Sequence, residues 1–111
     1  MKDDLLKIIN HYGVLPQLKH FNSEVFELNE AIFRYEDTYY EPYTDYSVEP
    51  ESYVSEEEQK KDLKQHIAEE IADCYVMLNQ FQLYYGIENK QIEETMKFKI
   101  DRQLERIENE R

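Results

Sequence analysis

The sequence predicts an all-α fold, an antiparallel bundle of four to five helices with one long acidic loop. Three observations support this prediction. Apolar residues recur every three or four positions, and no sustained apolar/polar alternation indicates strands. Only two glycines occur, Gly13 and Gly86, and both stand where helices are expected to end. The length of 111 residues suits one domain that covers residues 1–111.

The first half of the chain contains two expected helices. A short helix covers Lys2–His11 and is broken by Gly13. A longer helix starts at Pro16, because proline is favoured in the first turn of a helix. The expected core stripe of this longer helix has three- and four-residue spacing and consists of Leu18, Phe21, Val25, Leu28, Ile32 and Tyr35.

The second half begins with the strongest helix-start signal in the chain. Ser55 is followed three positions later by Glu58, which matches a capping box, and the helix is expected to run to Gly86. Its expected core stripe is Leu63, Ile67, Ile71, Cys74, Leu78, Phe81 and Tyr85. A fourth helix follows Glu88–Asn89, and its apolar positions are Ile92, Met96, Ile100, Leu104 and Ile107.

The charge is concentrated in one segment. The net charge is −12, and residues 36–58 contain nine acidic residues, five tyrosines and no basic residue. Pro42 and Pro50 interrupt this segment, so we expect an acidic, tyrosine-rich connection. Its charges favour a solvated loop, and its tyrosines suit cover by a partner or a neighbouring subunit. The overall acidity argues against duplex nucleic acid as a partner.

The composition also restricts the cellular setting. No run of eighteen apolar residues occurs, so no membrane-spanning helix is expected. The first ten residues include two acids and lack a long apolar stretch, unlike a secretory signal. The single cysteine, Cys74, excludes an internal disulfide framework and is expected to pack in the core. A cytoplasmic location is the simplest expectation.

Two pairs of carboxylates stand at helical spacing beside the expected core stripes. Glu24 and Glu27 are three residues apart, as are Glu70 and Asp73, and no basic residue follows any of them by four positions. If the two helices pack side by side, four carboxylates meet at the seam. A hard divalent cation, Mg²⁺ or Mn²⁺, would neutralise them. The alternative is an ordinary acidic surface, since 34% of the residues are charged.

The last helix carries a cationic stripe of Lys99, Arg102 and Arg106. Such a stripe can bind phosphate groups opposite a metal. Alternatively, these cations only complement the C-terminal end of the helix dipole and pair with nearby glutamates. The spacing alone slightly favours the second interpretation.

The order of these motifs resembles one enzyme family. Glu-x-x-Glu at Glu24–Glu27, Glu-x-x-Asp at Glu70–Asp73 and Lys-x-x-Arg at Lys99–Arg102 look like the motifs of the MazG-like and dimeric-dUTPase superfamily. Its members are all-α nucleoside triphosphate pyrophosphohydrolases. The resemblance extends from about Gly13 to Ile107.

The resemblance implies a reaction and a set of roles. An NTP or dNTP would be cut between its α- and β-phosphates, giving a nucleoside monophosphate and pyrophosphate. The implied metal ligands, with Mg²⁺ as cofactor, are Glu24, Glu27, Glu70 and Asp73, of which Glu27 and Glu70 are also implied catalytic residues. Lys99 and Arg102 would contact phosphate. The residues suggested to line a nucleotide pocket are His20, His66 and Lys97, the last standing where the family often has asparagine. A homodimer or homotetramer is expected.

A non-enzymatic interpretation stays open. A small acidic helical protein can mimic the charge of nucleic acid or cover a basic surface of a partner protein. That function would depend on the acidic run at residues 36–58, whereas the enzyme would depend on the four paired carboxylates.

Overall fold

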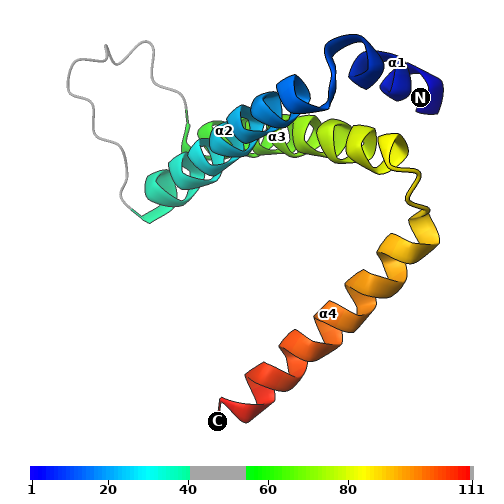
Figure 1. The fold of residues 1–111 in the computed structure, drawn as a ribbon. Coiled ribbons are helices and arrows are strands. Elements are labelled where there is room, and N and C mark those ends of the chain that lie inside the picture. Colours follow the sequence, from blue (N-terminus) through cyan, green and yellow to red (C-terminus); the bar gives the residue numbers. More distant parts are fainter. Residues whose placement is uncertain (41–54, 111) are drawn as a thin grey trace.

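The structure, a computed structural model, describes residues 1–40 and 55–110. These residues form four helices and no strand, so the all-α prediction is confirmed (Figure 1). The helices are α1 (Lys2–Tyr12), α2 (Val14–Tyr40), α3 (Glu56–Tyr84) and α4 (Asn89–Asn109). Within this described part of the chain, no helix combines the length and apolarity that crossing a membrane requires.

The helix ends expected at Gly13 and Gly86 and the helix start expected at Ser55 are confirmed. Helix α2 begins at Val14, two residues before the expected start at Pro16. Gly13 and Gly86 adopt φ angles of +92° and +67°, in the left-handed region that glycine reaches without strain. At the start of α3 the Ser55 hydroxyl accepts a hydrogen bond of 3.2 Å from the backbone N–H of Glu58. The third helix then runs without a break to Tyr84.

The acidic connection is shorter than the sequence predicted. Helix α2 continues to Tyr40, beyond the expected loop start at Glu36, because no proline occurs between Pro16 and Pro42. Helix α3 likewise includes the acidic residues after Ser55. The rest of the tyrosine-rich connection, residues 41–54, lies outside the described residues.

Helices α2 and α3 lie side by side, and α1 packs across the end of the pair where α2 begins (Figure 1). Ile9 of α1 is fully buried. Across the seam, the rings of Phe21 and Phe81 meet edge to face with centroids 5.8 Å apart. Beside them, the amide of buried Gln17 donates a 2.8 Å hydrogen bond to buried Gln80.

Part of the predicted stripe on each helix is shifted by one residue, whereas Cys74 is buried as predicted. In α2 the predicted Leu18 and Ile32 are 45% and 42% exposed, while the preceding residues are buried. In α3 the predicted Ile71 and Leu78 are similarly exposed, again beside buried residues. The buried positions in place of the four predicted ones are Gln17, Ala31, Glu70 and Met77. Both helices carry apolar residues over a wide arc, and one neighbouring helix covers only part of that arc.

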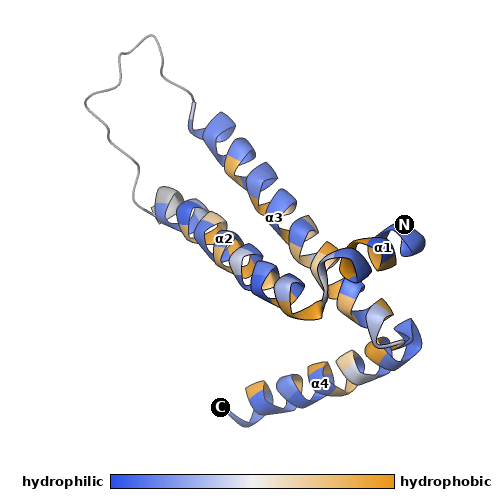
Figure 2. Ribbon diagram, turned by 45° about the horizontal axis from the view of Figure 1, so that its top comes forward, coloured by the Kyte–Doolittle hydropathy of each residue, from blue (hydrophilic) through white to orange (hydrophobic). Residues whose placement is uncertain are grey.

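Helix α4 does not complete the bundle. It points away from the α2/α3 pair and packs against none of the other described helices (Figures 1 and 2). Its apolar positions form orange patches along one side in Figure 2 but stay exposed; Met96 is 54% and Ile100 53% exposed. The α2/α3 pair therefore positions the carboxylates without help from α4.

Candidate metal centre

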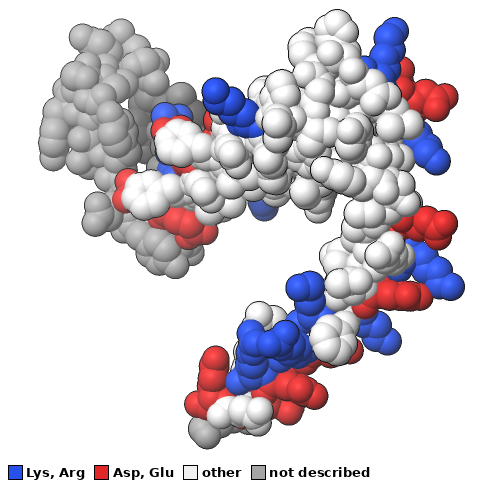
Figure 3. All heavy atoms as spheres, viewed as in Figure 1, with Lys and Arg blue, Asp and Glu red and all other residues white. Residues whose placement is uncertain are grey.

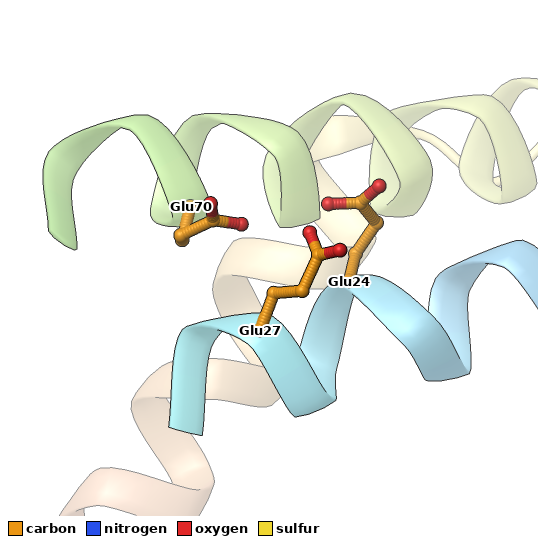
Figure 4. Close-up of side chains that lie close together, drawn as sticks. All are labelled: Glu24, Glu27 and Glu70. Atoms are coloured by element: carbon orange, nitrogen blue, oxygen red, sulfur yellow. The ribbon is translucent and has the colours of Figure 1, made fainter. Parts of the chain in front are cut away.

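Three of the four predicted metal ligands converge at the α2/α3 seam. Glu24 and Glu27 extend from α2, and Glu70 extends toward them from α3 (Figure 4). One oxygen atom from each carboxylate lies within 4.8 Å of the other two. Two oxygen ligands of one Mg²⁺ are at most about 4.2 Å apart, twice the usual bond length. A small side-chain rotation would therefore bring these oxygens to coordination distance.

Two of these carboxylates are buried, and each has one oxygen atom without a partner in the described structure. Glu24 and Glu70 are only 9% and 8% exposed. In each, the Oε2 atom is inaccessible and has no hydrogen-bond partner in the described structure. A buried carboxylate oxygen without a donor is unfavourable unless a proton or a cation binds it. The donor set, oxygen atoms only, fits a hard cation such as Mg²⁺.

The electrostatics of the cluster agree with this geometry. Burial is the main cause that raises the pKa of Glu24, and the charges of Asp73 and Glu27 raise this pKa further. Burial also raises the pKa of Glu70, with added repulsion from Glu27 and Asp73. The two side chains thus favour a neutral state or a neighbouring positive charge.

Each buried glutamate has a histidine one helical turn earlier. His20 Nε2 lies 3.2 Å from Glu24 Oε1, and His66 Nε2 lies 3.8 Å from Glu70 Oε1. A protonated imidazole at either place lowers the pKa of its glutamate and partly offsets the repulsion. The same i, i+4 arrangement occurs on both helices, so the two predicted pocket histidines border the cluster.

The remaining predicted residues have different positions. Asp73 is exposed and lies outside the three-carboxylate group, although its charge acts on both buried glutamates. Lys97, Lys99 and Arg102 are exposed on α4, which does not pack against the α2/α3 pair. The side chains of Gln82 and Asn89 form a hydrogen bond where α3 leads into α4. Cys74 is buried as predicted, and burial raises the pKa of its thiol.

A hollow of about 280 Å³ opens next to the cluster. Helices α2 and α3 both contribute to its walls, which consist of Glu27, Glu30, Ala31, Arg34, His66 and Glu70. The sequence analysis did not identify Arg34. Its spacing could have done so, because Arg34 follows Glu27 by seven residues and therefore lies two turns along the same side of α2.

The sequence predicted pocket roles for His20 and His66, each four residues before a glutamate of the cluster. The structure places each histidine within ion-pair distance of that glutamate. The chain matches no family model, no curated protein and no solved structure. A function can therefore be inferred only from this geometry and from the motif resemblance.

Proposed function

We propose that the protein is a metal-dependent nucleoside triphosphate pyrophosphohydrolase, which cuts an NTP or dNTP between its α- and β-phosphates. One observation carries the proposal: three carboxylates from two helices converge, and two of them hold buried oxygen atoms with no partner in the described structure. An acidic surface without function would leave such oxygens in water. The order of the motifs supports the choice of reaction.

Glu24, Glu27 and Glu70 would hold Mg²⁺, with Asp73 as a fourth ligand after a change of rotamer. The bound ion would supply charge neutralisation of the phosphates and a lowered pKa for a bound water. Glu27 is the exposed member of the three, so it is suited to accept a proton from the attacking water. The water oxygen bonds to phosphorus, the P–O bond between the α- and β-phosphates breaks, and pyrophosphate leaves.

Lys99 and Arg102 are proposed to bind phosphate on the basis of the motif resemblance alone. Because α4 stands apart from the carboxylates, this role requires that α4 of the same copy or of a second copy approaches the cluster. Figure 3 shows that α4 carries both basic and acidic side chains.

We propose a homodimer or homotetramer because the α2/α3 pair has an uncovered apolar face. Leu18 and Ile32 each follow a buried residue of α2 by one position, and Ile71 and Leu78 do the same on α3. In antiparallel helices these positions lie on the same side of the pair, since each residue turns the helix by about 100°. The face of the pair seen in Figure 3 is largely free of charged residues. A second copy would bury such a face.

A cytoplasmic location, where nucleotides and Mg²⁺ meet, completes the proposal. The non-enzymatic alternative depends on the acidic run at 36–58, and residues 41–54 of that run lie outside the described structure.

The test is product analysis with a matched pair of variants. Purified protein is incubated with NTPs and dNTPs and Mg²⁺ or Mn²⁺, and monophosphate and pyrophosphate are separated from diphosphate and orthophosphate. Glu70→Gln should lower turnover by about a hundredfold or more, because it removes a buried ligand and its charge. The adjacent Glu69→Gln changes the same charge on an exposed side chain and should keep most of the activity. Absence of turnover of every nucleotide by folded, metal-supplied protein would contradict the proposal.

A further inference from the structure

The hollow beside the carboxylates has a charged lining. Of its six lining residues, three are glutamates, one is an arginine and one is a histidine, and only Ala31 is apolar. No phenylalanine or tyrosine of the described chain borders it. A nucleobase is usually held by aromatic or apolar side chains, whereas this lining suits an ionic group bound together with a cation. The hollow therefore fits the phosphate part of a ligand better than its base.

Arg34 is the only side chain with a permanent positive charge among the described residues that line the hollow. It lies about 10 Å along the α2 axis from Glu27, at 1.5 Å per residue. Side chains on a helix lean toward its N-terminus, so Arg34 leans back toward Glu27. Its guanidinium can thus reach groups that extend from the carboxylate cluster into the hollow.

Among residues 1–40 and 55–110, no ion pair joins Arg34 to an acidic side chain. Glu30 precedes it by four residues, the spacing and order that favour an ion pair on a helix. Yet the described ion pairs join only His20 to Glu24, Lys60 to Glu56, and His66 to two glutamates. The guanidinium is therefore available to a ligand.

We propose that Arg34 binds the end of the triphosphate chain, so that the hollow is the subsite for the phosphates that extend beyond the metal centre. This inference rests on the proposed function. A guanidinium presents two parallel N–H donors to phosphate oxygens and keeps its charge at every physiological pH. Arg34 thereby adds a phosphate contact from α2 itself to the contacts that the motif resemblance assigns to α4. Anion binding next to acidic residues becomes favourable because the metal and Arg34 neutralise the two ends of the phosphate chain.

The test measures binding, separately from turnover. Inorganic tripolyphosphate is titrated into the protein by calorimetry with Mn²⁺ in excess, and Mn²⁺ alone is titrated in parallel. The variants are Arg34→Ala, Arg34→Lys and the control Lys19→Ala, which removes one positive charge from the same helix away from the hollow. Arg34→Ala should weaken tripolyphosphate binding by about tenfold or more, and Arg34→Lys should restore part of it. Lys19→Ala should stay within about twofold of the parent protein, and all variants should bind Mn²⁺ alike.

The outcomes separate this inference from the proposed function. Parent-like tripolyphosphate binding by Arg34→Ala, in a protein that hydrolyses nucleotides, would overturn the subsite and leave the enzyme intact. An equal loss in Lys19→Ala would replace the subsite by a general effect of net charge. A loss of Mn²⁺ affinity in Arg34→Ala would show that the arginine acts on the carboxylates instead. If the parent protein neither binds tripolyphosphate nor hydrolyses any nucleotide, the proposed function fails and the subsite with it.

Discussion

The α2/α3 pair and α4 are both built from long amphipathic helices, but they have different surroundings. In the pair, the seam residues are buried and three carboxylates meet between the helices. In α4, no residue is buried. The charges differ as well, since α4 has five basic and five acidic residues, whereas the pair has five basic and twelve acidic ones. Apolar periodicity therefore indicates a helix, but it does not indicate what covers the apolar side of that helix.

A matched pair of methionine substitutions tests this contrast most strongly. Met77 on α3 is 3% exposed, while Met96 on α4 is half exposed. Met77→Ala should lower the free energy of unfolding by about 2–4 kcal/mol, because it leaves a cavity at the seam. Met96→Ala should change it by less than about 0.5 kcal/mol. Urea denaturation at a protein concentration that keeps the chain monomeric gives both values, and equal losses would show that α4 packs within one chain.

A mixing experiment determines where α4 acts in the assembly. The double variant Lys99→Ala/Arg102→Ala should raise KM by about tenfold or more, because it removes two charge-assisted phosphate contacts. Mixed in equal amounts with Glu70→Gln, it should regain about a quarter of parental activity if α4 of one subunit serves the carboxylates of the other in a dimer. Only one site of each mixed dimer is then intact. Lack of recovery in confirmed mixed dimers would place α4 beside the carboxylates of its own chain.

The smallest expected effect is a pH dependence confined to the pair. The pKa values of Glu24 and Glu70 are raised above 4.5, so the native state binds their protons more tightly than the unfolded chain. This contribution to stability is complete below pH 4.5 and is lost as the pH rises through the raised values. In EDTA, the loss of this contribution should therefore lower Tm as the pH rises from 4.5 to 7.5.

The double variant Glu24→Gln/Glu70→Gln isolates that contribution. Its Tm in EDTA should depend less on pH than that of the parent protein, and it should exceed the parental Tm at pH 7.5, because the buried repulsion is gone. Added Mg²⁺ should raise the parental Tm and leave the variant unchanged. Circular dichroism at 222 nm follows both transitions. Identical pH profiles would mean that the buried carboxylates do not control stability.

The sequence predicted the helices and their ends well because the signals are local. Proline, glycine and a serine cap act within one turn, and Ser55, Gly13 and Gly86 behave as expected. The convergence of Glu24, Glu27 and Glu70 was predictable from their spacing. The exact face that each helix buries was not predictable. Leu18 was expected in the core, but its neighbour Gln17, one position earlier on the helix, is buried instead. The position of α4 was not predictable either, because apolar periodicity does not indicate whether another helix covers the apolar side.

The hydrogen bond between Gln17 and Gln80 has a consequence for the distant carboxylates. It fixes how far the two antiparallel helices are shifted along each other. On α2, Glu24 and Glu27 lie seven and ten residues after Gln17. On α3, Asp73 and Glu70 lie seven and ten residues before Gln80. Sliding one helix by a single turn would break the buried amide pair and separate every opposing acid by about 5 Å. Two glutamines at one end of the pair thus keep the acids of α2 opposite those of α3, about two to three helical turns away.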